Sequence, residues 1–259
     1  MDDAADIAGQ IWAVAAAEIE KLLHDPLELV TRAVQPVLWL LLFGEVMARV
    51  RGVAPGNLQY LDFLSAGILA QSCLFVAIFY GISAIWERDL GVLQRYLVSP
   101  APRFALVAGK ALSAGVRALS QALIVYILAL FLGVGIDLHP LSVLGVIAVI
   151  VLGSALFSTF SLIIACIVKT RERFMGIGQV LTMPVFFASN AIYPLSLMPA
   201  WLRAVSQANP LTYEVDALRS MMLTGGVSEY GVALDFGVLA GVAVVLTAIA
   251  ARLYGRMGY

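Results

Sequence analysis

The sequence predicts an all-α polytopic membrane protein that crosses the bilayer six times. Of its 259 residues, 61% are hydrophobic and 13% are charged, whereas a soluble domain carries about 25% charged residues. Several long stretches also lack Asp, Glu, Lys and Arg. Because a bilayer core about 30 Å thick needs about 20 apolar residues in a helix, such stretches are long enough to span it. The net charge of −1 lacks the basic excess of a general nucleic-acid binder.

We expect the whole chain, residues 1–259, to form a single transmembrane domain. The candidate spans are the apolar stretches at about 33–50, 62–85, 104–134, 141–167, 174–193 and 231–253. The first stretch contains Gln35, Pro36 and Glu45, which interrupt its apolar run. With the N-terminus inside, the inner segments hold eleven Lys and Arg residues and the outer segments hold four. The positive-inside rule therefore predicts that both termini are cytoplasmic.

Residues 5–24 precede the first expected span and have an amphipathic pattern. On a helical projection, one half is polar and acidic rather than basic, and the other half gathers the apolar side chains Ile7, Ile11, Trp12, Val14, Ile19, Leu22 and Leu23. This pattern predicts an interfacial helix that lies along the membrane surface. A helix packed on a partner subunit is the alternative.

A second amphipathic stretch, residues 86–98, lies between the second and third expected spans. As a helix, it would place Trp86, Leu90, Leu93 and Leu97 on one stripe, with the charged residues opposite. Prolines at positions 100 and 102 would end the helix, because proline interrupts helical hydrogen bonding. Periodicity alone leaves open whether this cytoplasmic helix rests in the interface or binds a cytosolic partner.

The segment 190–222, after the fifth expected span, is long for a loop yet rich in apolar residues. Pro194, Pro199 and Pro210 divide it into short pieces. Non-helical backbone at membrane depth has to be covered by protein or line a water-filled cavity. We therefore expect a re-entrant helical hairpin on the outer side, with an amphipathic outer-surface loop as the alternative.

The sequence predicts neither a catalytic site nor a metal site. It has no nucleotide-binding glycine loop, since Gly109 and Lys110 are followed by Ala111. It also lacks the HExxH and GxSxG motifs, and Cys73 and Cys166 are far apart. An ion-coupled secondary transporter is another open class, because ionisable groups inside spans are functional candidates. Those groups are Glu45, Asp62, Lys110, Arg117 and Asp235.

Two long motifs resemble the membrane subunits of ABC exporters of the ABC-2 type. Residues 86–110, WERDLGVLQRYLVSPAPRFALVAGK, are similar to the family pattern E-R-[ED]-x-G-T-L-x-x-L-x-x-[ST]-P followed by G-K. Val92 and Tyr96 depart from that pattern. Residues 190–219, NAIYPLSLMPAWLRAVSQANPLTYEVDALR, are similar to its P-x-W-L and N-P-L-T-Y-x-V-x-x-L-R motifs. The chain resembles most the small permeases of the daunorubicin-exporter and nodulation-factor-exporter type.

The resemblance implies a non-catalytic permease in the inner membrane of a bacterium, acting as a homodimer or pseudo-dimer. Two ATPase subunits would bind ATP and Mg²⁺, and this chain would bind no cofactor. The helix 86–98 would couple to the ATPase through Trp86, Glu87, Arg88, Asp89, Gly91, Leu93 and Arg95. The outer hairpin would gate the pathway through Pro194, Pro199, Trp201, Asn209, Pro210, Tyr213 and Arg219.

The resemblance also places the substrate pathway beside spans one, two and five. Candidate lining residues are Gln71, Ser72, Phe75, Phe79, Phe186, Phe187, Asn190 and Tyr193. Aromatic rings mixed with amide and hydroxyl groups suit an amphipathic drug-like or lipid-like substrate, although the rings could equally pack helix on helix. Export of a polysaccharide or lipid-linked glycan is the alternative within this family.

Overall fold

The computed structural model describes residues 26–48, 59–90, 103–168 and 170–254. Within these ranges the regular elements are helices, apart from an isolated antiparallel bridge between Ile136 and Leu223. The first six elements are α2 (Pro26–Leu38), the π-helical η1 (Trp39–Gly44), α3 (Glu45–Ala48), α4 (Tyr60–Tyr80), α5 (Ile82–Asp89) and α7 (Arg103–Phe131). They are followed by α8 (Pro140–Ile167), α9 (Arg171–Phe187), the short η2 (Leu195–Leu197), α10 (Ala200–Ala208), α11 (Pro210–Met222) and α12 (Val232–Tyr254).

Four of the described helices are long and apolar enough to cross a membrane. They cover Tyr60–Trp86, Val107–Phe131, Pro140–Ile167 and Val232–Leu253. The first and fifth expected spans coincide with shorter elements, namely α2–η1–α3 and the 17-residue α9. The count of six spans therefore stays a prediction. The expected interfacial helix 5–24 lies outside the described residues.

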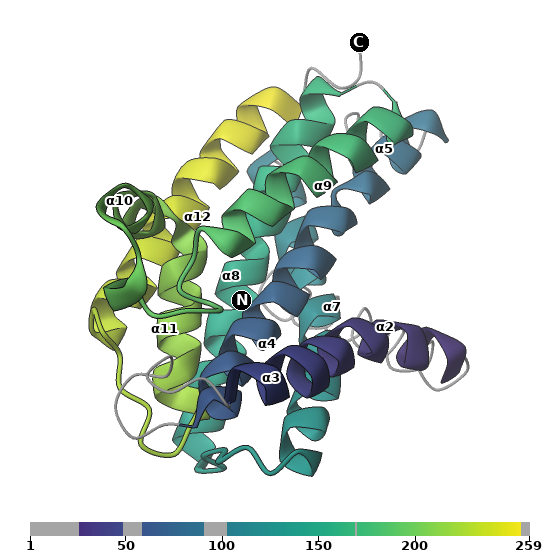
Figure 1. Ribbon diagram of the computed structural model, residues 1–259. Helices are drawn as coiled ribbons and strands as arrows, with labels where there is room; N and C mark the ends of the chain where they lie inside the picture. The colour runs from purple at the N-terminus through teal and green to yellow at the C-terminus, as the bar shows by residue number, and fades with distance from the viewer. Residues whose placement is uncertain (1–25, 49–58, 91–102, 169, 255–259) are drawn as a thin grey trace.

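The long helices run side by side along one direction of the molecule (Figure 1). Helix α8, which has 28 residues, packs against α4, α7, α11 and α12. In the most apolar part of each span, 65% of residues are buried in the span that begins with α4, but 17% in α12. Helix α4 therefore forms the inside of the bundle, and α12 contributes mainly an outer surface.

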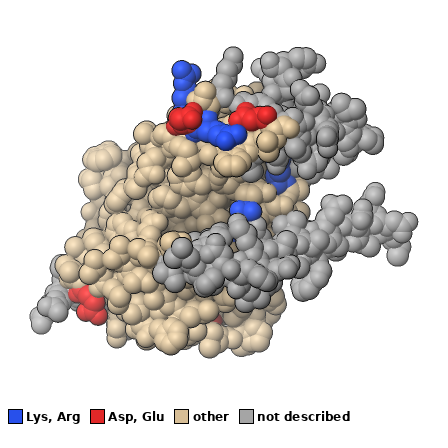
Figure 2. Space-filling view, turned by 90° about the vertical axis from the view of Figure 1, so that its right-hand side faces the viewer, with Lys and Arg blue, Asp and Glu red and all other residues tan. Residues whose placement is uncertain are grey.

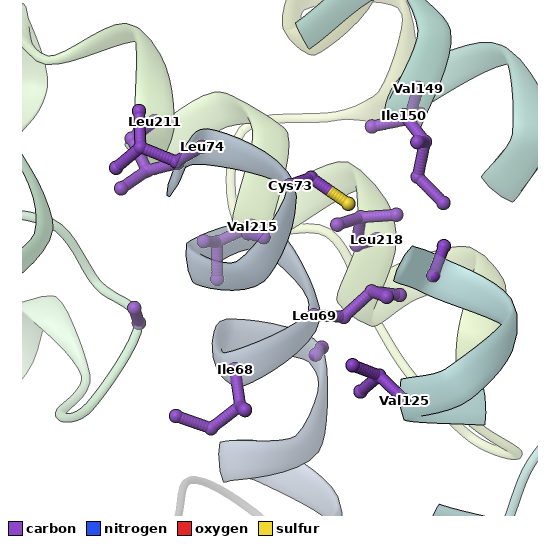
Figure 3. Packing of buried hydrophobic residues seen from close by; sticks show 14 of the residues in the cluster. Ile68, Leu69, Cys73, Leu74, Val125, Val149, Ile150, Leu211, Val215 and Leu218 are labelled. Carbon is purple, nitrogen blue, oxygen red and sulfur yellow. The ribbon is translucent and has the colours of Figure 1, made fainter. Parts of the chain in front are cut away.

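The core lies where α4, α7, α8 and α11 meet. Figure 3 shows apolar side chains of these four helices pointing toward one another, among them Leu69 and Leu74 of α4 and Val215 and Leu218 of α11. Close approach is needed at Gly67, because a Cβ atom there would overlap the Ala191 carbonyl group. Glycine is the residue that allows such contact between a helix and a neighbouring backbone.

The first described helices take another direction. In Figure 1, α2 and α3 run across the long helices rather than along them. Pro36 lies inside α2, where it removes one helical hydrogen-bond donor, and the widened π-helical turn of η1 begins at Trp39. These interruptions and the crossing direction explain why the segment from α2 to α3 does not form one straight apolar span.

Candidate functional site

Charged side chains gather at the end of the molecule formed by α5 and the start of α9, which we call the α5–α9 end. Figure 2 shows basic and acidic groups together there and a mostly uncharged surface below them. The Arg171 guanidinium lies 3.0 Å from the Asp89 carboxylate and 4.4 Å from the centre of the Trp86 ring. Arg171 and Asp89 are 40% and 38% exposed, so solvent screens this ion pair.

Two of the predicted coupling residues, Trp86 and Asp89, lie at this end. Helix α5 ends at Asp89, and the indole of Trp86 and the side chain of Leu90 are 49% and 71% exposed. The side chains of Glu87 and Arg88 lie outside the described part of the structure, as do the other predicted coupling residues Gly91, Leu93 and Arg95.

The predicted hairpin contains η2, α10 and α11, and we call this region, with the preceding loop 188–194, the hairpin end. Pro194 and Pro199 directly precede η2 and α10. Asn209 precedes α11 and accepts a hydrogen bond from the Leu211 N–H at 3.0 Å, a side-chain N-cap. Pro210 takes the first position of α11, where its missing N–H costs nothing.

Asn209 and Tyr213 also tie α11 to neighbouring backbone. The Asn209 amide donates to the Val185 carbonyl of α9 at 2.6 Å, and the Tyr213 hydroxyl donates to the Gln207 carbonyl of α10 at 2.7 Å. Trp201, in contrast, is 70% exposed on α10. The hairpin therefore has a bonded side and one large aromatic side chain that faces outward.

Arg219 is the buried cation of the hairpin end. Its guanidinium donates to the Asn190 carbonyl at 3.0 Å and lies 3.7 Å from the centre of the Phe63 ring. The Tyr60 hydroxyl donates to the nearby Ile192 carbonyl at 2.8 Å. Residues of α4 and α11 thus hold the loop 188–194 from two sides. The Asn190 side-chain amide is buried and has no hydrogen-bond partner among the described residues.

Asp216 holds the loop after α11, and no sequence motif marked it. Its carboxylate accepts hydrogen bonds from the Ser228 hydroxyl at 2.8 Å and from the backbone N–H groups of Glu229 and Tyr230 at 2.9 and 3.1 Å. Burial and the neighbouring Asp216 carboxylate raise the pKa of Glu229 above its ordinary value. The Ser228 hydroxyl also lies 3.0 Å from Asp235, which connects this loop to α12.

The predicted pathway residues of α4 have different environments. Gln71 is buried, and Ser72, Phe75 and Phe79 are partly buried. The rings of Phe75 and Phe79 stack with centroids 6.0 Å apart, and Phe79 reaches α9 beside Gly178. These aromatic side chains therefore lie between helices rather than in a described open channel.

The predicted residues Phe186 and Phe187 belong to a longer set that we call the aromatic row. Trp39 lies 5.8 Å from Phe186 and 5.2 Å from Phe43, measured between ring centroids. The row continues to Tyr60 and then to the buried Phe63, with centroid distances of 6.4 and 6.1 Å. Phe187 is 44% exposed at its outer end. Sequence analysis missed Trp39, Phe43, Tyr60 and Phe63 because no spacing rule links separate helices.

The remaining predicted pathway residues, Asn190 and Tyr193, lie in the loop 188–194 at the hairpin end. The Tyr193 hydroxyl donates to the Phe187 carbonyl, so it fixes the loop next to the aromatic row. Asn190 is fully buried beneath Arg219. The predicted set is therefore divided between the Phe75–Phe79 pair and the aromatic row.

Three of the ionisable groups considered for ion coupling, Asp62, Arg117 and Asp235, lie apart from one another in the described structure. Asp62 accepts from the Gly135 N–H at 3.2 Å, Arg117 lies 5.4 Å from the Tyr80 ring centre, and Asp235 contacts Ser228. Each belongs to a separate local contact. Within the described ranges, no group of three or more His, Cys, Asp or Glu side chains could hold a metal ion.

Comparison with known proteins identifies the family of this chain. The model of the ABC-2 type transporter family matches residues 9–223. The putative transport permease ycf38 of Cyanophora paradoxa is 32% identical over 77% of this chain and 69% of its own length. The daunorubicin resistance ABC transporter permease protein DrrB1 of Streptomyces coeruleorubidus is 26% identical over 89% and 81%, and nodulation protein J of Rhizobium leguminosarum bv. viciae is 26% identical over 76% and 73%.

The family match covers both sequence motifs and most of the helices described above. It begins before α2 and ends directly after α11. The chain therefore belongs to the ABC-2 type transporter family.

Proposed function

We propose that this chain is the membrane-spanning, non-catalytic permease subunit of an ATP-driven exporter in a bacterial inner membrane. Its substrate would be an amphipathic drug-like or lipid-like molecule. The family match over residues 9–223 carries the proposal, and the names of several relatives describe daunorubicin or multidrug permeases.

The energy source would lie in partner subunits. The sequence contains no nucleotide-binding glycine loop, so ATP and Mg²⁺ would be bound by an ATPase chain. Two ATPase copies and a second permease copy would complete the transporter. Both termini of the permease would be cytoplasmic, which also makes the α5–α9 end cytoplasmic and the hairpin end external.

The exposed part of α5 supports an ATPase contact at the α5–α9 end. Trp86 and Leu90 present apolar surface there beside the mixed charges of Asp89 and Arg171. A groove on a protein partner can bury the apolar groups while its own charges pair with the ionic ones. The helix 86–98 would then transmit ATPase movement to α4, because a single residue, Gly81, separates α4 from α5.

The aromatic row supports the substrate class. It leads from the exposed Phe187 to the buried Phe63 and ends beneath the Arg219 guanidinium. Such a surface offers apolar area to a hydrophobic substrate body and aromatic faces to planar groups. The hairpin end would close the pathway on the outer side.

Vesicle transport tests the proposal. The permease is reconstituted with the ATPase encoded beside it, and ATP-dependent movement of daunorubicin and of a fluorescent phospholipid is measured. We expect transport of at least one probe, reduced about tenfold by Phe187→Ala with ATP hydrolysis retained, since about 1.4 kcal/mol changes a rate tenfold. Phe131→Ala is the matched control, because Phe131 is exposed at the end of α7, outside the aromatic row.

Two results would contradict the proposal. The first is a complex that hydrolyses ATP but moves a polar glycan instead of either amphipathic probe. The second is full transport by the permease without an ATPase. Reconstitution of a Glu87→Arg variant adds a coupling test, since we expect ATP hydrolysis without transport.

A further inference from the structure

Helix α11 carries a carboxyl group that none of the contacts above uses. Glu214 lies between Tyr213 and Val215, and its side chain is fully buried. Neither carboxyl oxygen has a hydrogen-bond partner among the described residues. An ionised carboxylate in this position would lack both water and a compensating donor, so burial strongly disfavours the charged form.

The carboxyl group occupies a notch in α8. A Cβ atom at Gly153 would overlap the Glu214 carboxyl carbon and both of its oxygens. The side chain therefore lies directly on the α8 backbone, at a glycine, which has no side chain to exclude it. This fit places the group in a defined site between two packed helices.

The helices around Glu214 offer no cation to neutralise it. From α4, the titratable neighbour is the buried thiol of Cys73, which Figure 3 shows between α4 and α8. Helix α8 contains no Asp, Glu, Lys, Arg or His between Pro140 and Ile167.

The other packed elements use their charges elsewhere. The Asp, Glu, Lys and Arg residues of α12 are Asp235 in its first turn and Arg252 in its last, and Arg203 of α10 donates to the Leu195 carbonyl. Within α11, Asp216 binds the loop at 228–230 and Arg219 binds the Asn190 carbonyl.

We propose that Glu214 is a proton-binding site that holds its proton while α11 is packed against α4 and α8. A neutral carboxylic acid fits an uncharged notch, because loss of its proton would create a buried and unpaired anion. The proton would be released when α11 moves far enough for water to reach the carboxyl group. The proton site depends on the packing of α11 alone, whereas a role of the site in transport rests on the proposed function.

The sign of the pH effect follows from this difference in protonation. The packed state binds one proton more than any state in which Glu214 is exposed to neutral water. Rising pH therefore favours the exposed state, by about tenfold in the equilibrium constant per pH unit between the two pKa values. In an exporter, alkaline solution on the hairpin side would promote movement of α11.

Infrared spectroscopy of the purified full chain tests the proton directly. Wild-type protein at about pH 8, well above the ordinary glutamic acid pKa of about 4.3, is compared with Glu214→Gln. We expect the carbonyl stretch of a protonated carboxylic acid in the wild type and its loss in the variant. Glu172→Gln, which changes an exposed carboxylate of α9, should leave the band intact. Identical spectra of wild type and Glu214→Gln would overturn the proposal.

Unfolding equilibria in detergent give a second measurement. From about pH 6 to about pH 8, the wild type should become less stable relative to Glu214→Gln by about tenfold in the unfolding constant per pH unit. Glu172→Gln should keep the wild-type slope. Glu214→Leu serves as a second neutral variant if the glutamine chain does not fold. Equal slopes for wild type and a folded neutral variant would contradict the site.

The two proposals fail in distinguishable ways. A protonated-acid band at Glu214 with no ATP-driven transport in vesicles would refute the exporter and retain the proton site. Transport of an amphipathic probe with an ionised Glu214 would do the reverse.

Discussion

The hairpin end and the α5–α9 end of this protein are held together by different kinds of interaction. At the hairpin end, the buried side chains of Tyr60 and Arg219, with Asn209, donate to backbone carbonyls of distant segments. At the α5–α9 end, the polar link between α5 and α9 is the half-exposed contact of Arg171 with Asp89 and Trp86, beside a small apolar core that includes Ile85 and Phe174.

These interactions differ in what their removal costs. Deleting the donor from a buried hydrogen bond leaves an unsatisfied acceptor and costs about 1–3 kcal/mol. An exposed ion pair contributes about 0–1 kcal/mol, and an exposed cation–π contact contributes about 0.5–1 kcal/mol. The comparison teaches that the polar contacts of the hairpin end are buried and strongly stabilising, whereas those of the α5–α9 end are exposed and can be exchanged for contacts with a partner at little cost.

Arg219→Ala should have the largest effect on stability. It removes a charged donor from the Asn190 carbonyl and leaves a cavity above Phe63, so we expect a loss of about 3 kcal/mol. Chemical unfolding in mixed micelles measures it. Arg173→Ala, at an exposed position of α9, should change stability by less than about 0.5 kcal/mol. Equal effects of the two substitutions would remove the contrast between the ends.

Gly67→Ala should destabilise the protein by about 2 kcal/mol, within the range for overpacked cores. The added methyl group would overlap the Ala191 carbonyl, and backbone yields less readily than a side-chain tip. Thermal unfolding in detergent measures the loss. Gly237→Ala in α12 is the matched control, since no atom lies within 4 Å of a Cβ there. A neutral Gly67→Ala variant would show that the loop 188–194 is loosely held.

Asn209→Ala should cost about 1–2 kcal/mol, because it removes the N-cap of α11 and the donor to Val185. Asn209→Ser sharpens the assignment, since serine can replace the cap but is too short to replace both bonds. We expect an intermediate stability for the serine variant by the same unfolding assay. An alanine variant as stable as the wild type would contradict the bonded hairpin.

Asp89→Asn should have the smallest effect on the isolated chain, under about 1 kcal/mol, because its partner Arg171 is half exposed. The informative measurement is binding of the ATPase to the purified permease, compared with the stability change. We expect ATPase affinity to fall by more than the stability does. A stability loss above roughly 2 kcal/mol, twice the exposed-pair limit, would show that this exposed contact stabilises the chain as much as the buried contacts of the hairpin end.

Sequence reasoning worked best where local composition decides the structure. Helices α8 and α12 follow from long apolar runs, since only such runs supply enough apolar length for a span. It worked less well at α9, which ends at Phe187 rather than near 193. Pro184 lies in its last turn, and the following chain bends into the loop that Tyr60 and Arg219 hold.

Long-range partners were beyond the reach of pattern analysis. Asn209, Pro210 and Arg219 stood in a recognisable motif, but their acceptors Val185 and Asn190 did not. Asp216 and Glu214 lie two residues apart and have different contacts. Asp216 accepts hydrogen bonds from a loop, and Glu214 packs on Gly153. Only the packing of α11 against α8 and α12 separates these roles, because neighbouring helix positions face different elements.

The length of α8 has a consequence for the surrounding lipid. Its 28 residues extend about 42 Å at 1.5 Å per residue, whereas the hydrocarbon layer is about 30 Å thick. A straight apolar rod of that size produces hydrophobic mismatch, which is relieved by tilting or by local thickening of the bilayer. Membrane thickness therefore acts as a mechanical load on the helix against which Glu214 rests.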